Sequence, residues 1–246
     1  MATLLLFAVA VWAGAQNALA GGGSFLLLPT LMFTGMDALA ANITSCAALF
    51  PAQVATGWTG RRFADGANGL SLRALFVISV IGGAVGAAVL LGTPPGIFAR
   101  LVPWLVLFAT AIFAWGSFFR KPSKTGAHLS APSAGLAQFL ISIYGGYFGG
   151  GIGFLMVAAL TMAGQSVRVA SATKNVLAGV MNASAVAIFV FSPELHWRQA
   201  LITAVGATIG GVFGARLIHH IDERLLRFFI IGIGAALTVG LFLKAP

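Results

Sequence analysis

Polar residues that could bind a solute occur twice in this chain, at matching positions 129 residues apart. Within each set the spacings are 0, 3, 4 and 11, which places the four residues on one face of a helix. The first set is Asn42, Ser45, Cys46 and Gln53, and the second is Ser171, Lys174, Asn175 and Asn182. Polar side chains are unfavourable against lipid, so a polar stripe on an apolar helix should face the interior of a bundle.

Lys174 is the basic residue that lies well inside an apolar segment, and that segment contains no acidic residue. Two interpretations are open: the side chain snorkels to the cytoplasmic interface, or its ammonium attracts an anion towards a central cavity. Thr44 and Thr173 also repeat, one position off the stripe. They either line the same cavity or bond back to a carbonyl one turn earlier in their own helix.

A glycine cluster precedes each polar stripe. The clusters are Gly21, Gly22 and Gly23 in the first half, and Gly149, Gly150, Gly151 and Gly153 in the second. Glycine permits backbone conformations closed to other residues, and a helix that follows presents free amide N–H groups and a positive dipole end to an anion. The alternative is close helix packing. Repetition in register favours a role in solute binding.

The repetition indicates an internal duplication, because eight of 25 aligned positions are identical between residues 21–45 and 150–174. Each half contains five apolar segments, and we divide the chain into a first repeat (1–119), a polar linker (120–133) and a second repeat (134–246). The predicted helices are 2–19, 24–33, 38–60, 72–91 and 101–119, then 134–147, 152–163, 167–191, 199–217 and 225–243. The first two segments of each half are too short, or barely long enough, to cross the bilayer alone, which predicts half-helices or a re-entrant pair broken at the glycines.

Composition indicates a membrane protein, since 59% of the residues are hydrophobic and 8% are charged. The net charge of +9 comes from basic residues in short breaks between apolar segments, so a nucleic-acid partner is not expected. If each broken pair re-enters, one side of the membrane receives ten basic residues and the other three. The positive-inside rule then places the ten in the cytoplasm and both termini outside, and makes the halves inverted repeats. The first apolar run resembles a signal peptide, but no basic residue precedes it, and we expect it to be retained.

Other chemistries have little support in this sequence. Cys46 is the single cysteine, so the chain has no internal disulfide and no thiolate metal site. The acidic residues all fall in predicted loops or at segment ends, and the pair His219–His220 falls in a charged loop. No HExxH motif, paired acids or Ser/His/Asp spacing occurs. We therefore expect no enzyme activity, metal or cofactor.

The glycine-rich stretch Gly21–Pro29 with Thr44-Ser45, and its repeat Gly149–Phe154 with Thr173-Lys174-Asn175, resembles the sulfite exporter TauE/SafE family. The resemblance covers nearly the whole chain, with one departure, Ala158 at the position of Pro29. It implies export of a small sulfur-containing anion, sulfite or an organosulfonate, across the bacterial inner membrane.

The sequence thus predicts an all-α, multi-pass inner-membrane bundle of two inverted repeats. The glycine breaks would meet near the midplane and frame a substrate site lined by Asn42, Thr44, Ser45 and Gln53, and by Ser171, Thr173, Lys174, Asn175 and Asn182. Rocking of one half against the other, or a gate at the broken segments, would give alternating access. The expected partners are a small anion and the lipid bilayer; the oligomeric state is open, with a homodimer as one arrangement. Two alternatives remain: a permease for another small solute, and a non-transporting membrane partner subunit.

Overall fold

The computed structural model describes residues 2–19, 22–118, 129–217 and 223–244. These residues form a helical bundle without β-strands in the described ranges. The helices of the first half are α1 (Ala2–Leu19), α2 (Ser24–Phe33), α3 (Ala38–Gly60), α4 (Leu72–Leu91) and α5 (Pro95–Phe118), with a short 3-10 turn η1 (Arg61–Phe63) after α3. Those of the second half are α6 (Ala131–Tyr147), α7 (Ile152–Met162), α8 (Val167–Phe189), α9 (Trp197–Leu217) and α10 (Glu223–Lys244).

Four predicted helix starts are corrected by the structure: α9 and α10 begin two residues earlier than predicted, at Trp197 and Glu223, and the larger shifts occur at α5 and α6. α5 begins at Pro95 instead of Leu101, and α6 begins at Ala131 instead of Ala134. Both helices carry proline in the first turn, where its missing N–H has no helical acceptor to lose. In α6 the Ser130 side chain accepts a hydrogen bond from Ser133 N, which fixes the start within the predicted linker.

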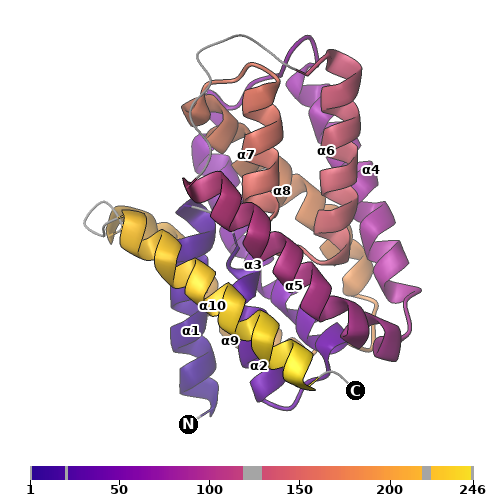
Figure 1. Cartoon of the computed structure of the whole chain (residues 1–246), viewed down its shortest axis with the longest axis vertical. Coiled ribbons are helices and arrows are strands. Elements are labelled where there is room, and N and C mark those ends of the chain that lie inside the picture. The colour runs from indigo at the N-terminus through magenta and orange to yellow at the C-terminus, as the bar shows by residue number, and fades with distance from the viewer. Residues whose placement is uncertain (1, 20–21, 119–128, 218–222, 245–246) are drawn as a thin grey trace.

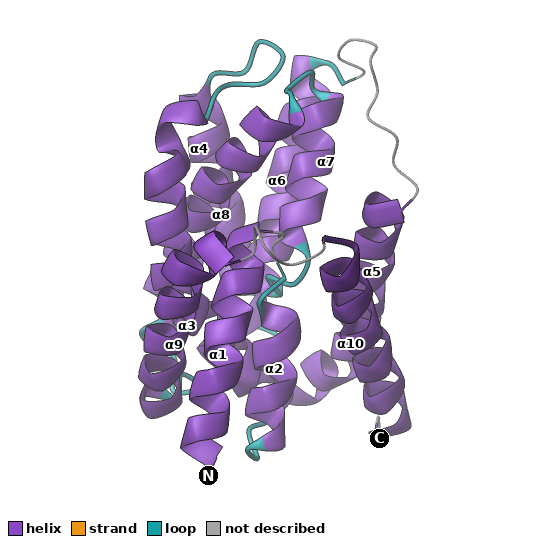
Figure 2. Cartoon of the chain, turned by 90° about the vertical axis from the view of Figure 1, so that its left-hand side faces the viewer, coloured by secondary structure: helices purple, strands orange, loops and turns teal. Residues whose placement is uncertain are grey.

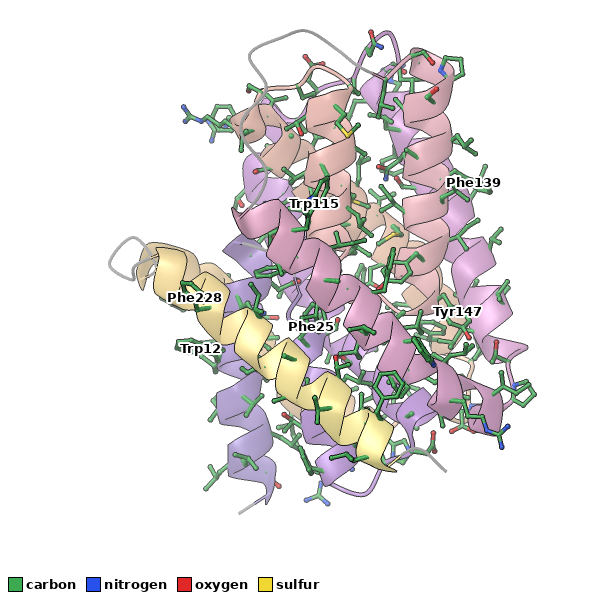
Figure 3. All side chains as sticks on the ribbon, in the orientation of Figure 1. Trp12, Phe25, Trp115, Phe139, Tyr147 and Phe228 are labelled. Atoms are coloured by element: carbon green, nitrogen blue, oxygen red, sulfur yellow. The ribbon has the colours of Figure 1, made fainter. Side chains whose placement is uncertain are left out.

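The outer surface of the bundle suits a lipid environment. Among the described residues, four segments are long and apolar enough to cross a membrane: Ala38–Phe63, Leu72–Leu91, Pro95–Trp115 and Val167–Phe189. Large apolar side chains point outwards, with Trp104 60% and Trp115 61% exposed, whereas Phe25 is buried between helices (Figure 3). In water such a surface would be an aggregation hazard, so its natural surroundings are lipid chains.

The two broken helix pairs enter the bundle from opposite ends. α1 begins and α2 ends at the lower end in Figure 2, while α6 begins and α7 ends at the upper end. α2 has 10 residues and α7 has 11, so each rises about 15 Å and reaches roughly half-way through a hydrocarbon core of about 30 Å. Each pair is therefore a re-entrant hairpin whose tip lies inside the protein.

The two halves pack against each other through equivalent helices. α1 packs along α9, and its counterpart α6 packs along α4. In the same way α3 contacts α9 while α8 contacts α4, and α2 contacts α10 while α7 contacts α5. The pairs α3–α8 and α5–α10 each join a helix to its own counterpart. Each of these contacts is therefore matched by the contact between the two equivalent helices, as expected if a duplication produced the chain.

The turn that precedes each polar helix is also repeated in detail. Gly35 has φ 95° and Gly164 has φ 93°, the left-handed conformation that favours glycine. Two residues later, Asp37 caps α3 and Ser166 caps α8 by accepting hydrogen bonds from backbone N–H groups of the first turn, at 3.0 and 3.3 Å. These turns fix where α3 and α8 begin, and hence the height of every polar residue on them.

Basic residues are unevenly divided between the two ends of the bundle. The upper end, where α3 meets α4 and α8 begins, holds Arg61, Arg62, Arg73 and Arg168 (Figure 1). The lower end, at the starts of α5 and α9, holds Arg100 and Arg198. The remaining loop and terminal basic residues lie outside the part of the chain whose side chains are described. The described residues follow the predicted distribution.

Candidate functional site

The two glycine breaks lie beside each other at mid-height of the bundle, at the tips of the re-entrant hairpins (Figure 2). A Cβ atom added at Gly149 would stand 3.4 Å from Sγ of Cys46 and 3.9 Å from Oγ of Ser24. Ser24 is the first residue of α2 and Cys46 lies in α3. The break before α7 therefore contacts the start of α2, which brings two helix N-termini towards the centre of the molecule.

The backbone at both breaks requires glycine. Gly22 has φ 85°, and its counterpart Gly151 has φ 74° and is the N-terminal cap of α7. A Cβ atom at Gly151 would also stand 3.0 Å from Cβ of Ala109 in α5. Glycine is needed here for two reasons: the backbone is left-handed, and a neighbouring helix lies too close for a side chain. The permissive backbone and the close helix packing, which were alternatives on the sequence alone, therefore both apply. Gly21 lies outside the described residues.

A small pocket lies between α1, α3, α7 and α8. Its lining residues are Asn17, Gln53, Thr56, Ile152, Gly153, Lys174, Asn175 and Ala178. The pocket has a volume of about 10 Å³, roughly the space that one water molecule needs. Four of the sequence-predicted residues, Gln53, Gly153, Lys174 and Asn175, therefore meet in one place, around a space too small for a solute larger than water.

Lys174 is the charged member of this set. Its side chain is 4% exposed, and no hydrogen bond or ion pair joins its ammonium to another described residue. It lines the pocket together with Ile152 and Gly153, the first two residues of α7, whose N–H groups have no acceptor within the helix. Lys174 therefore does not snorkel to the surface. An ammonium and a helix N-terminus that face one pocket can hold an anion.

Gln53 and Asn182, which are equivalent positions of the two halves, bond directly to each other. Asn182 Nδ2 donates to Gln53 Oε1 at 2.7 Å and to the Cys46 carbonyl oxygen at 3.2 Å. Because the Gln53 oxygen is engaged by Asn182, the Gln53 NH2 group is left as the hydrogen-bond donor towards the pocket. This pair joins α3 to α8 at the centre of the contact between the halves.

Thr44 and Thr173 tie each half to a loop of the other. Thr173 Oγ1 accepts from Asp65 N at 3.1 Å and donates to the Asp65 carbonyl oxygen at 3.3 Å. Thr44 Oγ1 accepts from His196 N at 3.3 Å. Asp65 follows α3 at the upper end and His196 precedes α9 at the lower end. The two threonines thus serve the opposite ends of the bundle, which neither sequence interpretation anticipated.

The other predicted residues lie outside the pocket lining. Asn42 Nδ2 donates to the Tyr147 carbonyl oxygen at 3.0 Å, which ties α3 to the end of α6. Ser45 is fully buried and its Oγ has no hydrogen-bond partner among the described residues, while Ser171 is half-buried in α8. Gly23 caps α2 against α1. Their contribution to a transport path stays a prediction, as does that of Gly150.

Two polar pocket residues, Asn17 and Thr56, were missed by the sequence reasoning, as were the apolar Ile152 and Ala178. Thr56 lies three residues after Gln53 and continues the same helical stripe, so the spacing rule could have included it. Asn17 is a polar residue at the end of α1, and its Oδ1 accepts from Gly23 N at 3.4 Å. Its only signal was a polar side chain four residues before a glycine cluster.

No group of three or more His, Cys, Asp or Glu side chains comes together among the described residues. The pair His219–His220 and Asp222 lie outside them.

Comparison with known proteins assigns the family. The sequence profile of the sulfite exporter TauE/SafE family matches residues 6–241. The chain belongs to the sulfite exporter TauE/SafE family. Its residues form a multi-pass membrane protein of a transporter family.

Several relatives of this TauE/SafE chain align over nearly its whole length. A probable membrane transporter protein of Haemophilus influenzae is 26% identical over 95% of this chain and 92% of the relative. The probable membrane transporter protein YfcA of Escherichia coli is 25% identical over 96% and 88%, respectively. The probable membrane transporter protein ORF9 of a Sinorhizobium species is 26% identical over 96% and 90%. No solved structure matches the chain significantly.

Proposed function

We propose that this protein exports a small sulfur-containing anion, sulfite or an organosulfonate, from the cytoplasm across the bacterial inner membrane. The observation that carries the proposal is the buried, unpartnered ammonium of Lys174 beside the first turn of α7. A buried charge is stabilised by an opposite charge, and no carboxylate of the described residues supplies one. An anion that enters the pocket would meet the ammonium, the Gln53 amide donor and free helix N–H groups together.

The unequal charges at the two ends support the direction of transport. By the positive-inside rule, the upper end with Arg61, Arg62 and Arg168 faces the cytoplasm, and the re-entrant hairpins make the halves inverted repeats. Across an inside-negative membrane, outward movement of one negative charge is favoured by about 2.3 kcal/mol per 100 mV. An exporter of anions can therefore run on the membrane potential without a carboxylate that carries a coupling proton.

The threonine bonds support alternating access as the mechanism. At the upper end Asp65 is held by Thr173 and by Gln165, whose Nε2 donates to the Asp65 and Gly66 carbonyl oxygens at 2.8 and 2.9 Å. At the lower end Thr44 holds His196. Both sets are formed while the pocket is too small for sulfite, which fits an occluded conformation. Release of one set while the other persists would open the pocket to one side only.

The test is flux into proteoliposomes of the purified protein, with sulfite, a small sulfonate and a neutral solute under an imposed potential. Lys174→Met keeps the length of the buried side chain and removes its charge, and should lower anion flux at least tenfold. Arg100→Ala is the matched control, since it removes an exposed charge from α5, a helix that does not line the pocket. Unchanged flux in Lys174→Met would remove the ammonium from the site. Movement of the neutral solute alone would replace the anion exporter with another permease, and no movement would favour a partner subunit.

A further inference from the structure

We infer that the pocket selects anions with a single negative charge and discriminates against dianions of similar size. The inference rests on the proposed function and specifies the charge of its substrate. Its basis is the number and placement of the charged groups that face the pocket, on which the family assignment is silent.

The pocket can supply at most one full positive side-chain charge. Among its lining side chains Lys174 is the one that can carry a positive charge, while Asn17, Gln53, Thr56 and Asn175 are neutral. The duplication does not supply a second ammonium, because the position equivalent to Lys174 in the first half is Ser45. The first turn of α7 adds a partial positive charge of about one half. The fixed charge that faces a bound ion therefore lies between one and two.

Two electrostatic terms decide which ion such a pocket prefers. Attraction between the bound ion and the fixed charges grows linearly with the charge of the ion. The cost of removing the ion from water grows with the square of its charge, and it is large in a buried site. Doubling the charge of the anion thus doubles its attraction to the fixed charges and quadruples the free-energy cost of its desolvation. With a single ammonium as partner, the monoanion is favoured.

The neutral side chains do not offset this preference. Gln53 presents its NH2 group, because Asn182 engages its oxygen at 2.7 Å. An amide donor binds one anion oxygen but brings no net charge, so it stabilises monoanions and dianions through the same contact. Selection by charge is therefore left to Lys174 and to the helix end.

Thr56 is the position at which this selectivity can be changed. It lines the pocket, is half-buried, and its Oγ1 bonds only to the Ala52 and Gln53 carbonyl oxygens of its own helix, both at 3.0 Å. Thr56→Lys would add a second ammonium without removing a bond between helices. Thr59→Lys, one turn further, adds the same charge at an exposed position and is the matched control.

The experiment compares methanesulfonate, which is a monoanion, with sulfate, which is a dianion, in proteoliposomes of the full chain at equal potential. We expect the unmodified protein to move methanesulfonate at least tenfold faster than sulfate. Thr56→Lys should reduce that ratio by about tenfold, which corresponds to about 1.4 kcal/mol, and Thr59→Lys should leave it unchanged.

The outcomes separate the inference from the proposed function. Sulfate flux equal to or above methanesulfonate flux would overturn the charge inference and leave the exporter intact. Absence of flux for both ions and for sulfite would overturn the proposed function itself. If Thr56→Lys does not fold, the ratio in the unmodified protein and the charge carried per transported ion, measured electrically, still decide the question.

Discussion

At the scale of single residues, positions that align between the two halves carry different chemistry. Lys174 and Ser45 occupy the same place in the two halves, yet one is a buried ammonium at the pocket and the other a buried hydroxyl without a partner. Thr44 and Thr173 keep the same role, as acceptors from loops of the opposite half. Both halves thus contain the equivalent threonine hydrogen bond, whereas the buried lysine occurs only in the second half.

Asn182 should stabilise the contact between α3 and α8. Asn182→Ala leaves two buried acceptors, Gln53 Oε1 and the Cys46 carbonyl, without their donor. We expect a loss of about 1–3 kcal/mol in the free energy of unfolding, measured by denaturation in detergent. Ser184→Ala, which removes a bond to the Met181 carbonyl oxygen of its own helix, is the control and should have a smaller effect.

A double-mutant cycle tests whether the effect belongs to the pair. If Gln53 and Asn182 act together, the combined change Gln53→Ala/Asn182→Ala should cost less than the sum of the single changes. Strict additivity would show that the 2.7 Å bond contributes nothing of its own to stability.

The sequence predicted the polar stripes because helical periodicity determines which side chains share a face. It could not predict their partners, since these come from distant segments: Asn42 bonds at Tyr147, and Thr44 at His196. Periodicity also does not tell at which position along the bundle axis the polar stripe of α3 faces that of α8. Lys174 and Gln53 therefore reach the pocket, while Ser45 on the same stripe as Gln53 does not line it.

At the scale of elements, the bounds of the first four helices are those predicted, because their apolar runs end at or within two residues of glycine or charged residues. The largest errors occur at α5 and α6, whose predicted starts fall after a proline that lies in the first turn of the helix. The predicted starts of α9 and α10 fall two residues late. The re-entrant course of α1–α2 and α6–α7 followed from their lengths. The contact of Gly149 with Cys46 and Ser24 required the three-dimensional structure.

Gly151 should determine how α7 begins. Gly151→Ala forces a left-handed conformation on a residue with Cβ, which costs about 1–2 kcal/mol, and places that Cβ 3.0 Å from Ala109. We expect a lower melting temperature in detergent and reduced anion flux, since the first turn of α7 faces the pocket.

The control for this change is Gly96→Ala in the first turn of α5, where no atom lies within 4 Å of the added Cβ. Alanine is favoured over glycine in a helix, so this variant should be at least as stable as the unmodified protein. Equal stability of the two variants would show that the break before α7 does not need glycine.

At the scale of the whole molecule, export of an anion on the membrane potential depends on orientation. We expect the upper end, which holds Arg61, Arg62, Arg73 and Arg168, to face the cytoplasm. Single cysteines introduced into a Cys46→Ala background can test this in intact cells. Gly96→Cys at the lower end should react with a membrane-impermeant thiol reagent, and Ser133→Cys at the upper end should react only after the membrane is permeabilised. The unmodified protein is a silent reference, because Cys46 is 3% exposed. The reverse pattern would place the arginine-rich end outside, and the threonine bonds at Asp65 would then close the external entrance instead of the cytoplasmic one.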